Sequence, residues 1–418
     1  MREWLRRLVA PASDAPRVFS CGRSTLTQHD GVRHLRIDEP DAYRAGWATG
    51  RLLADSGDGM VRLLRLPLLG VVAWLACRIA RRHVARVVVP ADVSDELHGL
   101  ADATGIRWHT LYFANVVFDV AKRYGFHCST LVFFGGGTVR VGRNTDLLPA
   151  LAALALRVVR PLVVEVTLPG KARYTHVSVP CFVGVLNGWN EHGITVHSHQ
   201  VIHVAEDPSG PRLASSLLMR RLLEGADSLA AAEAIARAHP TMRSLNVVVA
   251  SVREQRGLVL EVHPDRLHVL AHDADFGCGT HFASETMRPL HDGPIEASEQ
   301  RLSSMQAMIA QTPEPDLAAL RRMLQDSRHG LRHCLSGRSV SNEGTFQSFV
   351  LDVARGLVVV SNGLRRPVST SGRSVEVRVG VAAAPLPVRP AGADLPHAPA
   401  GPPPRCASAW LDTERRPV

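Results

Sequence analysis

The chain has 418 residues, of which 45% are apolar and 21% charged, and its formal net charge is +9. This composition suffices for one large core or two smaller ones, so most of the chain should be globular. Aromatic residues make up only 5% and do not alternate with the arginines, so nucleic-acid binding is not expected. Seven scattered cysteines without a CxxC pair indicate neither a disulfide framework nor a zinc ribbon, and they favour a reducing, cytoplasmic location.

Helices dominate the first part of the predicted structure. The segment Asp41–Leu53 follows a proline and predicts a short helix. A second helix is expected over Asp92–Ala103, because acidic residues occupy its first turn and Gly105 follows as its stop. A third helix is expected from about Trp108 to Lys122.

The apolar segment Leu66–Cys77 is uncharged and has arginines on both sides. It is too short to span a bilayer, which takes about 20 residues. A buried or amphipathic helix is the simpler interpretation, although Pro67 and Gly70 weaken it. The alternative is an interfacial helix that contacts lipid, with peripheral membrane contact through residues 60–89 and arginines near the head groups.

From Cys128 onward the pattern changes to strands. Cys128–Phe134, three glycines and Thr138–Arg143 predict a β-hairpin, because glycine permits the positive φ angles of a tight turn. The elements expected after it are strands at Val163–Thr167, Tyr174–Val179, Phe182–Leu186 and Ile194–Val201, helices at Leu213–Leu223 and Leu229–Ala238, a hairpin of Leu245–Ser251 with Leu258–His263, helices at Gln300–Ile309 and Asp316–Leu324, and a hairpin of Phe346–Val353 with Leu357–Ser361. Two groups of strands with helices between them predict an α+β chain with a layered or αββα arrangement.

The hairpin brings reactive side chains together near Cys128. If the chain turns at Gly136, paired positions sum to about 272, and Cys128 lies opposite residue 144, within two positions. The hairpin therefore places Arg143 and Asp146 beside the cysteine. Arg143 can hold a carboxylate or lower the pKa of the thiol, and Asp146 can accept a hydrogen bond from an amine.

A cut between His127 and Cys128 would give Cys128 a thiol and a free α-amine. The reference pKa of an α-amine, about 7.7–8.0, suits a base near neutral pH. One residue would then supply both nucleophile and base. From the hairpin alone, the competing interpretation is a buried cysteine at the start of an ordinary strand. His127 could assist the cut, or it could be an exposed linker residue.

The stretch CSTLVFFGGGTVRVGRNTD resembles the nucleophile strand of the penicillin acyltransferase (acyl-coenzyme A:6-aminopenicillanic acid acyltransferase) family of N-terminal-nucleophile (Ntn) hydrolases. Bile salt hydrolases and acid ceramidase-like amidases are more distant relatives of that family. Three further pieces follow the family's order: Asp95–Asn115 resembles the helix pair before the cleavage point, Gly188–Ile194 the G-x-N-E-x-G-L turn, and Thr345–Asp352 the terminal hairpin. The resemblance spans roughly residues 35 to 365.

The resemblance implies the four-layer αββα sandwich of the Ntn hydrolases. It also implies a cut that separates a helical part, 1–127, which is removed or retained, from a catalytic part, 128–381. The remaining residues, 382–418, form a Pro- and Ala-rich tail that we expect to be disordered.

The resemblance also assigns roles to residues. Cys128 would be the nucleophile, with Arg143 and Asp146 as its partners. Asn190, in the G-x-N-E-x-G turn, and Arg301, which matches a family arginine near the site, are assigned to substrate binding.

The sequence departs from the family at the expected oxyanion hole. The family run T-N-H-F is here Gly279–Phe282, so its asparagine is replaced, and Thr280 or His281 could donate instead. Gln200 lies near the place of a second asparagine in bile salt hydrolases. Losing an oxyanion donor can cost about 10²–10³ in rate, so either Thr280 and Gln200 rebuild the hole or the protein is a weak or specialised member of the family. Asn246 is interpreted as structural.

The predicted function is that of a self-processing cysteine Ntn hydrolase or acyltransferase. It would act without a cofactor on a linear amide bond of a small N-acyl substrate, through an acyl-enzyme on Cys128. Water or a second amine would release the acyl group. The apolar segment 66–77 favours an apolar acyl group.

Two other hypotheses remain open at this stage. The first is a zinc-dependent hydrolase, because four histidines cluster between His192 and His203, and His197, His199 and His203 share one face of a strand. No carboxylate or cysteine completes that site in an obvious way, so no metal is predicted. The second is a non-catalytic binding relative that keeps the fold.

Overall fold

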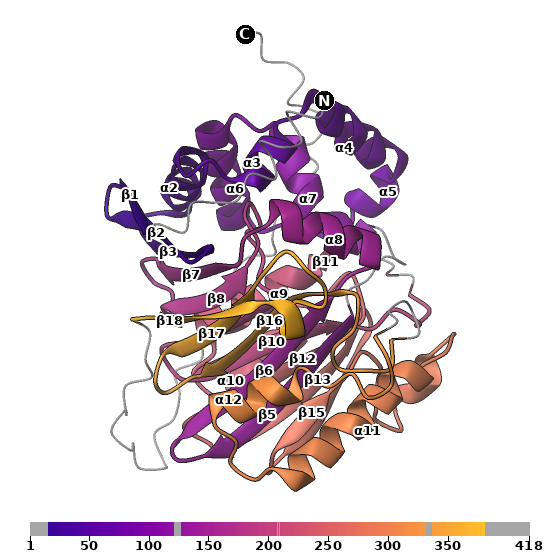
Figure 1. Ribbon diagram of the computed structural model, residues 1–418. Helices are drawn as coiled ribbons and strands as arrows, with labels where there is room; N and C mark the ends of the chain where they lie inside the picture. Colours follow the sequence, from indigo (N-terminus) through magenta and orange to yellow (C-terminus); the bar gives the residue numbers. More distant parts are fainter. Residues whose placement is uncertain (1–15, 121–126, 207, 209, 332–336, 381–418) are drawn as a thin grey trace.

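The computed structural model describes residues 16–120, 127–206, 208, 210–331 and 337–380. Two large β-sheets lie face to face at its centre (Figure 1). The ten-stranded sheet has the order β1 (Arg17–Cys21), β2 (Ser24–His29), β3 (Val32–Asp38), β7 (Leu162–Thr167), β8 (Tyr174–Ser178), β9 (Asn187–Asn190), β10 (Ile194–Gln200), β12 (Leu245–Ser251), β13 (Arg256–His263) and β14 (Arg266–His272). The six-stranded sheet has the order β15 (Phe276–Cys278), β5 (His127–Gly135), β6 (Thr138–Asp146), β16 (Thr345–Asp352), β17 (Leu357–Asn362) and β18 (Arg373–Arg378).

Side-chain alternation along the strands separates the cores. On β5, Val132 points into the core between the two sheets, whereas Leu131 and Phe133 point to the opposite face. That outer face is covered by α11 (Glu296–Gln311) and α12 (Leu317–Met323). A period of two residues thus gives each strand two buried faces, as a sheet between two other layers requires.

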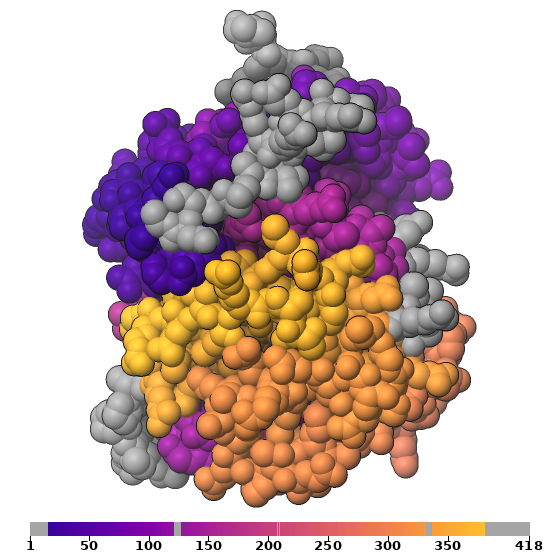
Figure 2. Space-filling model, viewed as in Figure 1, coloured from indigo at the N-terminus to yellow at the C-terminus, as the bar shows by residue number. Residues whose placement is uncertain are grey.

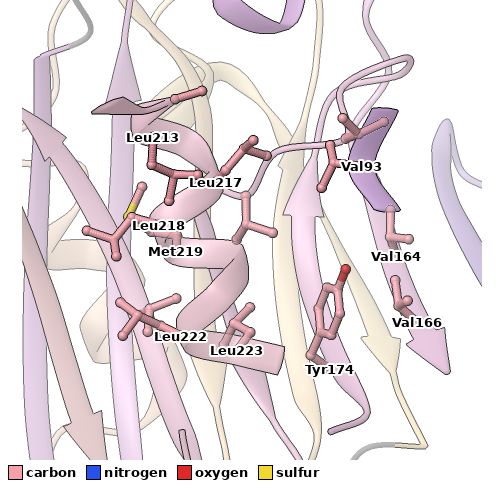
Figure 3. Close-up of a cluster of buried hydrophobic side chains, with 14 of the residues drawn as sticks. Val93, Val164, Val166, Tyr174, Leu213, Leu217, Leu218, Met219, Leu222 and Leu223 are labelled. Carbon is pink, nitrogen blue, oxygen red and sulfur yellow. The ribbon is translucent and has the colours of Figure 1, made fainter. Parts of the chain in front are cut away.

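Helices also cover the outer face of the ten-stranded sheet. α9 (Ser215–Gly225) packs its apolar side against the sheet through Leu218 and Leu222, as Figure 3 shows. α10 (Leu229–Ala238) follows and begins at Ser228, whose side chain accepts from the N–H of Ala231. With helices outside both sheets, the predicted four-layer αββα sandwich is confirmed.

The remaining helices lie mostly above the edge of the large sheet (Figure 1). α2 (Ala42–Asp55) and α6 (Ala91–Thr104) approach closely at Gly46 and Gly99; a Cβ on Gly46 would lie 1.9 Å from the carbonyl oxygen of Glu96. No larger residue fits there, so glycine sets the distance between these helices. The others are α3 (Gly59–Leu64), α4 (Pro67–Ile79), α5 (Arg81–Val84), α7 (Trp108–Val120), α8 (Pro149–Val158), α13 (Val368–Ser371) and the short η1 (Arg288–Leu290), while β4 (Val87–Val88) and β11 (Arg212–Leu213) form a small separate sheet.

Residues 1–127 were expected to form a helical part. The described residues of this part also contain strands, so that expectation is corrected. The strands β1, β2 and β3 extend the large sheet, and β3 pairs in parallel with β7. A cut at residue 127 would therefore leave two segments that share one sheet. The predicted disordered tail, 382–418, lies outside the described residues.

The strand predicted over 182–186 does not form. Its backbone is held by helix side chains instead: the amide of Asn115 bonds to Cys181 O at 3.0 Å and to Val183 N at 2.8 Å. Arg220 donates to Val183 O at 2.9 Å. Because these polar groups satisfy the buried backbone, no strand neighbour is needed.

The apolar segment 66–77 forms α4 despite its proline. Pro67 occupies the first turn, where a missing N–H costs no hydrogen bond, so it starts the helix and does not break it. Within the described residues, no helix combines the length and apolarity that crossing a bilayer demands.

Candidate active site

The predicted hairpin register is confirmed. Cys128 pairs with Thr145, one position from the predicted residue, and His127 pairs with Asp146. Arg143 and Asp146 therefore lie on the strand next to the cysteine, and all three side chains are buried. Burial raises the pKa of the Cys128 thiol to about 11, while the positive charge of Arg143 opposes the shift.

Arg143 is held by groups from both sheets. Its Nη1 donates to Thr130 Oγ1 at 2.9 Å and to His199 Nε2 at 2.7 Å, and Nη2 donates to the carbonyl of Ser198. Because a guanidinium can only donate, His199 Nε2 must be an acceptor, so the ring is neutral. Burial and the Arg143 charge hold the pKa of His199 well below its usual value. The sequence analysis considered His199 only in the zinc hypothesis and did not identify it as the partner of Arg143.

Asp146 lies between two donors from a distant segment. Thr345 Oγ1 donates to its Oδ1 at 2.7 Å, and Asn342 Nδ2 donates to its Oδ2 at 2.8 Å. Burial raises the pKa of this carboxyl to about 6, and the two hydrogen bonds limit the rise because they stabilise the anion. Asp146 is thus an ionisable group that titrates slightly below neutral pH.

We expect Thr345→Val to move the acid limb of the pH–activity profile upward, by roughly one pH unit, because a donor to the Asp146 anion is lost. In the unchanged protein, activity that requires ionised Asp146 should fall as the pH drops through about 6. The raised pKa has the opposite effect on folding: the stability that it contributes is present at low pH and is lost as the pH rises through about 6.

A matched control for this substitution lies at the far end of the same strands. Thr138 Oγ1 donates to the buried carboxylate of Asp352 at 2.6 Å. Thr138→Val removes the same kind of bond away from Cys128 and should leave the acid limb in place. An equal shift in both variants, measured as kcat/KM against pH, would contradict the assignment to Asp146.

A cavity opens at Cys128 between the two sheets and the first helices. Gln200 lines it together with Cys128 and Arg143, so the structure brings these three predicted site residues together. Its apolar wall comes from side chains of α7, α9, the start of β12 and the loop before β9, namely Phe118, Met219, Leu245, Phe182 and Leu186.

The cavity also has polar residues that the sequence did not single out. Asp119 accepts from Ser215 N at 2.9 Å and from Ser215 Oγ at 2.6 Å, and burial raises its pKa to about 6. Arg243 lies on the same wall, ion-paired with Glu206 at 3.1 Å. These groups come from separate helices and loops, so only the fold assembles them.

A second, smaller cavity lies on the other side of the His127–Cys128 bond. His127, His203, Thr280 and Arg301 line it, and His127 is buried, so it is not an exposed linker residue. Arg301 Nη2 donates to Thr280 Oγ1 at 3.0 Å, and Thr280 Oγ1 donates to Ser298 Oγ at 3.2 Å. The predicted residues Thr280 and Arg301 are therefore together, but they are next to His127 and not in the cavity of Gln200.

Asn190 does not reach either cavity. Its Nδ2 donates to the carbonyls of Leu223 and Ala226, at 3.1 and 2.7 Å, and its Oδ1 accepts from two backbone N–H groups of the following turn. All of this amide's hydrogen-bonding groups are occupied by backbone, so we correct its role from substrate binding to fixing the β9–β10 turn against α9. Asn246 has the structural role expected, since its amide binds the carbonyl of His281 at 2.7 Å.

The histidines of the zinc hypothesis have separate partners. His197 Nε2 lies 2.9 Å from Thr195 Oγ1, His199 contacts Arg143, and His203 lies beyond the end of β10. In the part of the chain that the structure describes, no three His, Cys, Asp or Glu side chains are grouped so that they could hold a metal ion. The geometry therefore gives the zinc hypothesis no site there.

Comparisons with solved structures find distant likenesses. The chain is similar to the Caenorhabditis elegans N-acylethanolamine-hydrolyzing acid amidase ortholog, with 16% identity and a TM-score of 0.38, over 54% of this chain and 92% of that one. It is also similar to two structures of altered conjugated bile acid hydrolase from Clostridium perfringens, with 10% and 11% identity and TM-scores of 0.39, over 63% of this chain and all of theirs. No curated protein matches the sequence.

The family comparison covers more than half of the chain. The family described as acyl-coenzyme A:6-aminopenicillanic acid acyl-transferase matches residues 134–363. This range begins within β5, in the hairpin that carries Arg143 and Asp146, and ends just after β17. The chain therefore belongs to the acyl-coenzyme A:6-aminopenicillanic acid acyl-transferase family of enzymes.

Proposed function

We propose that this protein is a self-processing cysteine Ntn hydrolase or acyltransferase whose nucleophile is Cys128. The observation that carries the proposal is the position of the thiol, which lies on the cavity wall beside Arg143, one strand away from Asp146. A cysteine of purely structural use would need neither a cavity nor two buried ionisable side chains on the neighbouring strand. Burying Arg143 and Asp146 is costly, and such groups are typical of functional sites.

The first proposed step is the cut between His127 and Cys128. The Cys128 thiol adds to the carbonyl carbon of His127, its proton passes to the peptide nitrogen, and the C–N bond breaks to leave a thioester and a free α-amine. Water then hydrolyses the thioester, which frees the thiol and gives His127 a carboxylate. Before the cut, burial raises the pKa of this thiol to about 11.

The second proposed step is the attack on substrate. The α-amine of Cys128 takes the thiol proton, the thiolate attacks the amide carbonyl, and the amine passes its proton to the leaving nitrogen. Asp146, which pairs with residue 127, would accept a hydrogen bond from the new α-amine. Water or a second amine then releases the acyl group from sulfur.

The substrate that the cavity supports best is a small N-acyl compound with an apolar acyl group. Five apolar side chains line the wall that faces Cys128, including Phe118, Phe182 and Met219. A wall of this kind favours an alkyl or aryl acyl chain over a charged one. Asp119 and Arg243 are the polar groups of the same cavity that could meet the amine half of the substrate.

Processing tests the proposal most directly. Freshly purified, active protein should give two fragments on a denaturing gel, and Edman sequencing of the larger should begin at Cys128 followed by Ser129 and Thr130. On a native gel the two fragments should migrate together, since β3 and β7 pair across the cut. Active protein that consists of one uncut chain would refute the proposed mechanism.

A further inference from the structure

The helix α4 exposes its large apolar side chains and buries its small ones. Leu68 and Ile79 are 72% and 77% exposed, and Val72 and Leu75 lie between them at helical spacing, so one side of the helix is apolar and open. The exposed apolar residues of this helix are Leu68, Val71, Val72, Trp74, Leu75 and Ile79. A surface helix of a globular protein normally has the reverse arrangement, with large apolar residues toward the core.

The inner side of α4 already has a partner. Gly70, Ala73 and Cys77 recur at helical spacing and are buried against the protein. The carbonyl of Gly70 lies 3.1 Å from Nε2 of His109, which is on α7. The fold thus attaches α4 through its small residues, and the exposed side chains contribute little to its anchoring.

The charge around this helix has one sign. Between Asp58 and Asp92 the sequence contains no aspartate or glutamate, while Arg62, Arg65, Arg78, Arg81, Arg82 and Arg86 fall in that interval. The two flanking carboxylates are already neutralised, Asp58 by Arg33 and Asp92 by Lys171 and Arg221. Arg78 and Trp74 form a cation–π contact, with the guanidinium carbon 5.1 Å from the ring centroid.

We propose that the exposed face of α4 docks on an anionic lipid surface. The apolar side chains would enter the acyl boundary, with Trp74 at the head-group level and Arg78, Arg81 and Arg82 against lipid phosphates. Figure 1 shows α4 and α5 at the upper right of the molecule, and Figure 2 shows this part of the chain at the surface. Charge complementarity selects an anionic surface, because the charged residues between Asp58 and Asp92 are all arginines.

A second copy of the chain fits this face less well. In a two-fold symmetric dimer the same patch meets itself, so two patches that both carry the arginines of α5 and of the end of α4 would be brought together. Like charges across an interface oppose association. A lipid surface meets the same residues with opposite charge and needs no matching groove.

The docking surface is connected to the candidate active site through α7. One part of α7 carries α4, through His109, and a later part lines the Cys128 cavity, through Asn115 and Phe118. Lipid docking would thus bring the cavity near a source of apolar acyl compounds. The docking itself does not depend on the proposed function, because it can be measured without substrate.

The test is flotation of the full chain with vesicles. Vesicles of phosphatidylcholine with phosphatidylglycerol should carry the protein, and vesicles of phosphatidylcholine alone should carry far less. Leu68→Ser/Leu75→Ser/Ile79→Ser should lower the bound fraction at least about tenfold. Arg78→Gln/Arg81→Gln/Arg82→Gln should lower it by about a hundredfold at low salt, because each arginine near an anionic surface contributes about fivefold.

Matched controls exist elsewhere on the surface. Val18, Leu331 and Leu364 are 66%, 44% and 50% exposed, so Val18→Ser/Leu331→Ser/Leu364→Ser makes the same change away from α4 and should bind like the unchanged protein. Equal flotation of all variants would overturn the proposal. A concentration-dependent dimer that dissociates in the α4 serine variant would also overturn it. So would binding of the full chain to an acidic polypeptide such as polyglutamate but not to anionic vesicles.

Discussion

Replacing Cys128 with alanine should abolish both the cut before residue 128 and the turnover of an N-acyl substrate. The substitution removes the sulfur that attacks in each step, and no other thiol lines the cavity within the described residues. Removal of a nucleophile of this kind costs on the order of 10⁶ in kcat. The chain should therefore run as one band on a denaturing gel and show no measurable activity.

Cys278 provides a matched control for this substitution. It is a second buried cysteine of the same sheet, on β15 next to β5, and burial raises the pKa of its thiol as well. Cys278→Ala should still be cut, and it should lose stability by no more than a small side-chain truncation costs. Iodoacetamide should label Cys128 in preference to Cys278. Normal processing in Cys128→Ala would refute the assignment of the nucleophile.

The sequence could predict the hairpin because the information is local. Three consecutive glycines at the turn, two of them Gly136 and Gly137 with φ angles of +61° and +72°, fix where the chain reverses. Once the turn is fixed, pairing follows from counting, so the positions of Arg143 and Asp146 relative to Cys128 could be read within one residue. The order of the predicted elements, two groups of strands with helices between them, indicated the layers.

The partners of these residues could not be predicted, because they come from far along the chain. Asp146 is held by Asn342 and Thr345, about two hundred residues later, and Arg143 by His199 on the other sheet. Only the packing of the two sheets brings those segments together. Spacing alone cannot specify such contacts, and it cannot distinguish a pocket residue from one that serves the backbone.

Asn190 and α4 illustrate what spacing alone cannot distinguish. An asparagine in a family-like turn was assigned to substrate, but its amide is used by backbone groups of α9 and the turn. For α4, the apolar run predicted a helix and could not say which side of it is exposed. The helix buries Gly70, Ala73 and Cys77, on the side where the carbonyl of Gly70 lies against His109 of α7.

Two substitutions can show whether Gln200 or Thr280 supplies the hydrogen-bond donor that replaces the family asparagine. The tetrahedral intermediate carries negative charge on the former carbonyl oxygen, and a hydrogen-bond donor must meet it. Gln200 lines the cavity of the Cys128 thiol, whereas Thr280 lies in the cavity beside His127. The hydroxyl of Thr280 is directed at Ser298 Oγ, 3.2 Å away, and its oxygen accepts from Arg301.

We therefore expect Gln200 to carry more of the oxyanion stabilisation than Thr280 during substrate turnover. Gln200→Met keeps a side chain of similar length without a donor, and kcat should fall by about 10²–10³ with little change in KM, because the contact forms mainly in the transition state. Thr280→Val should lower kcat by less than about tenfold, since its proton is already engaged with Ser298. A large loss in Thr280→Val together with unchanged kcat in Gln200→Met would instead place the donor at Thr280, and the Thr280–Ser298 hydrogen bond would then have to break when substrate binds.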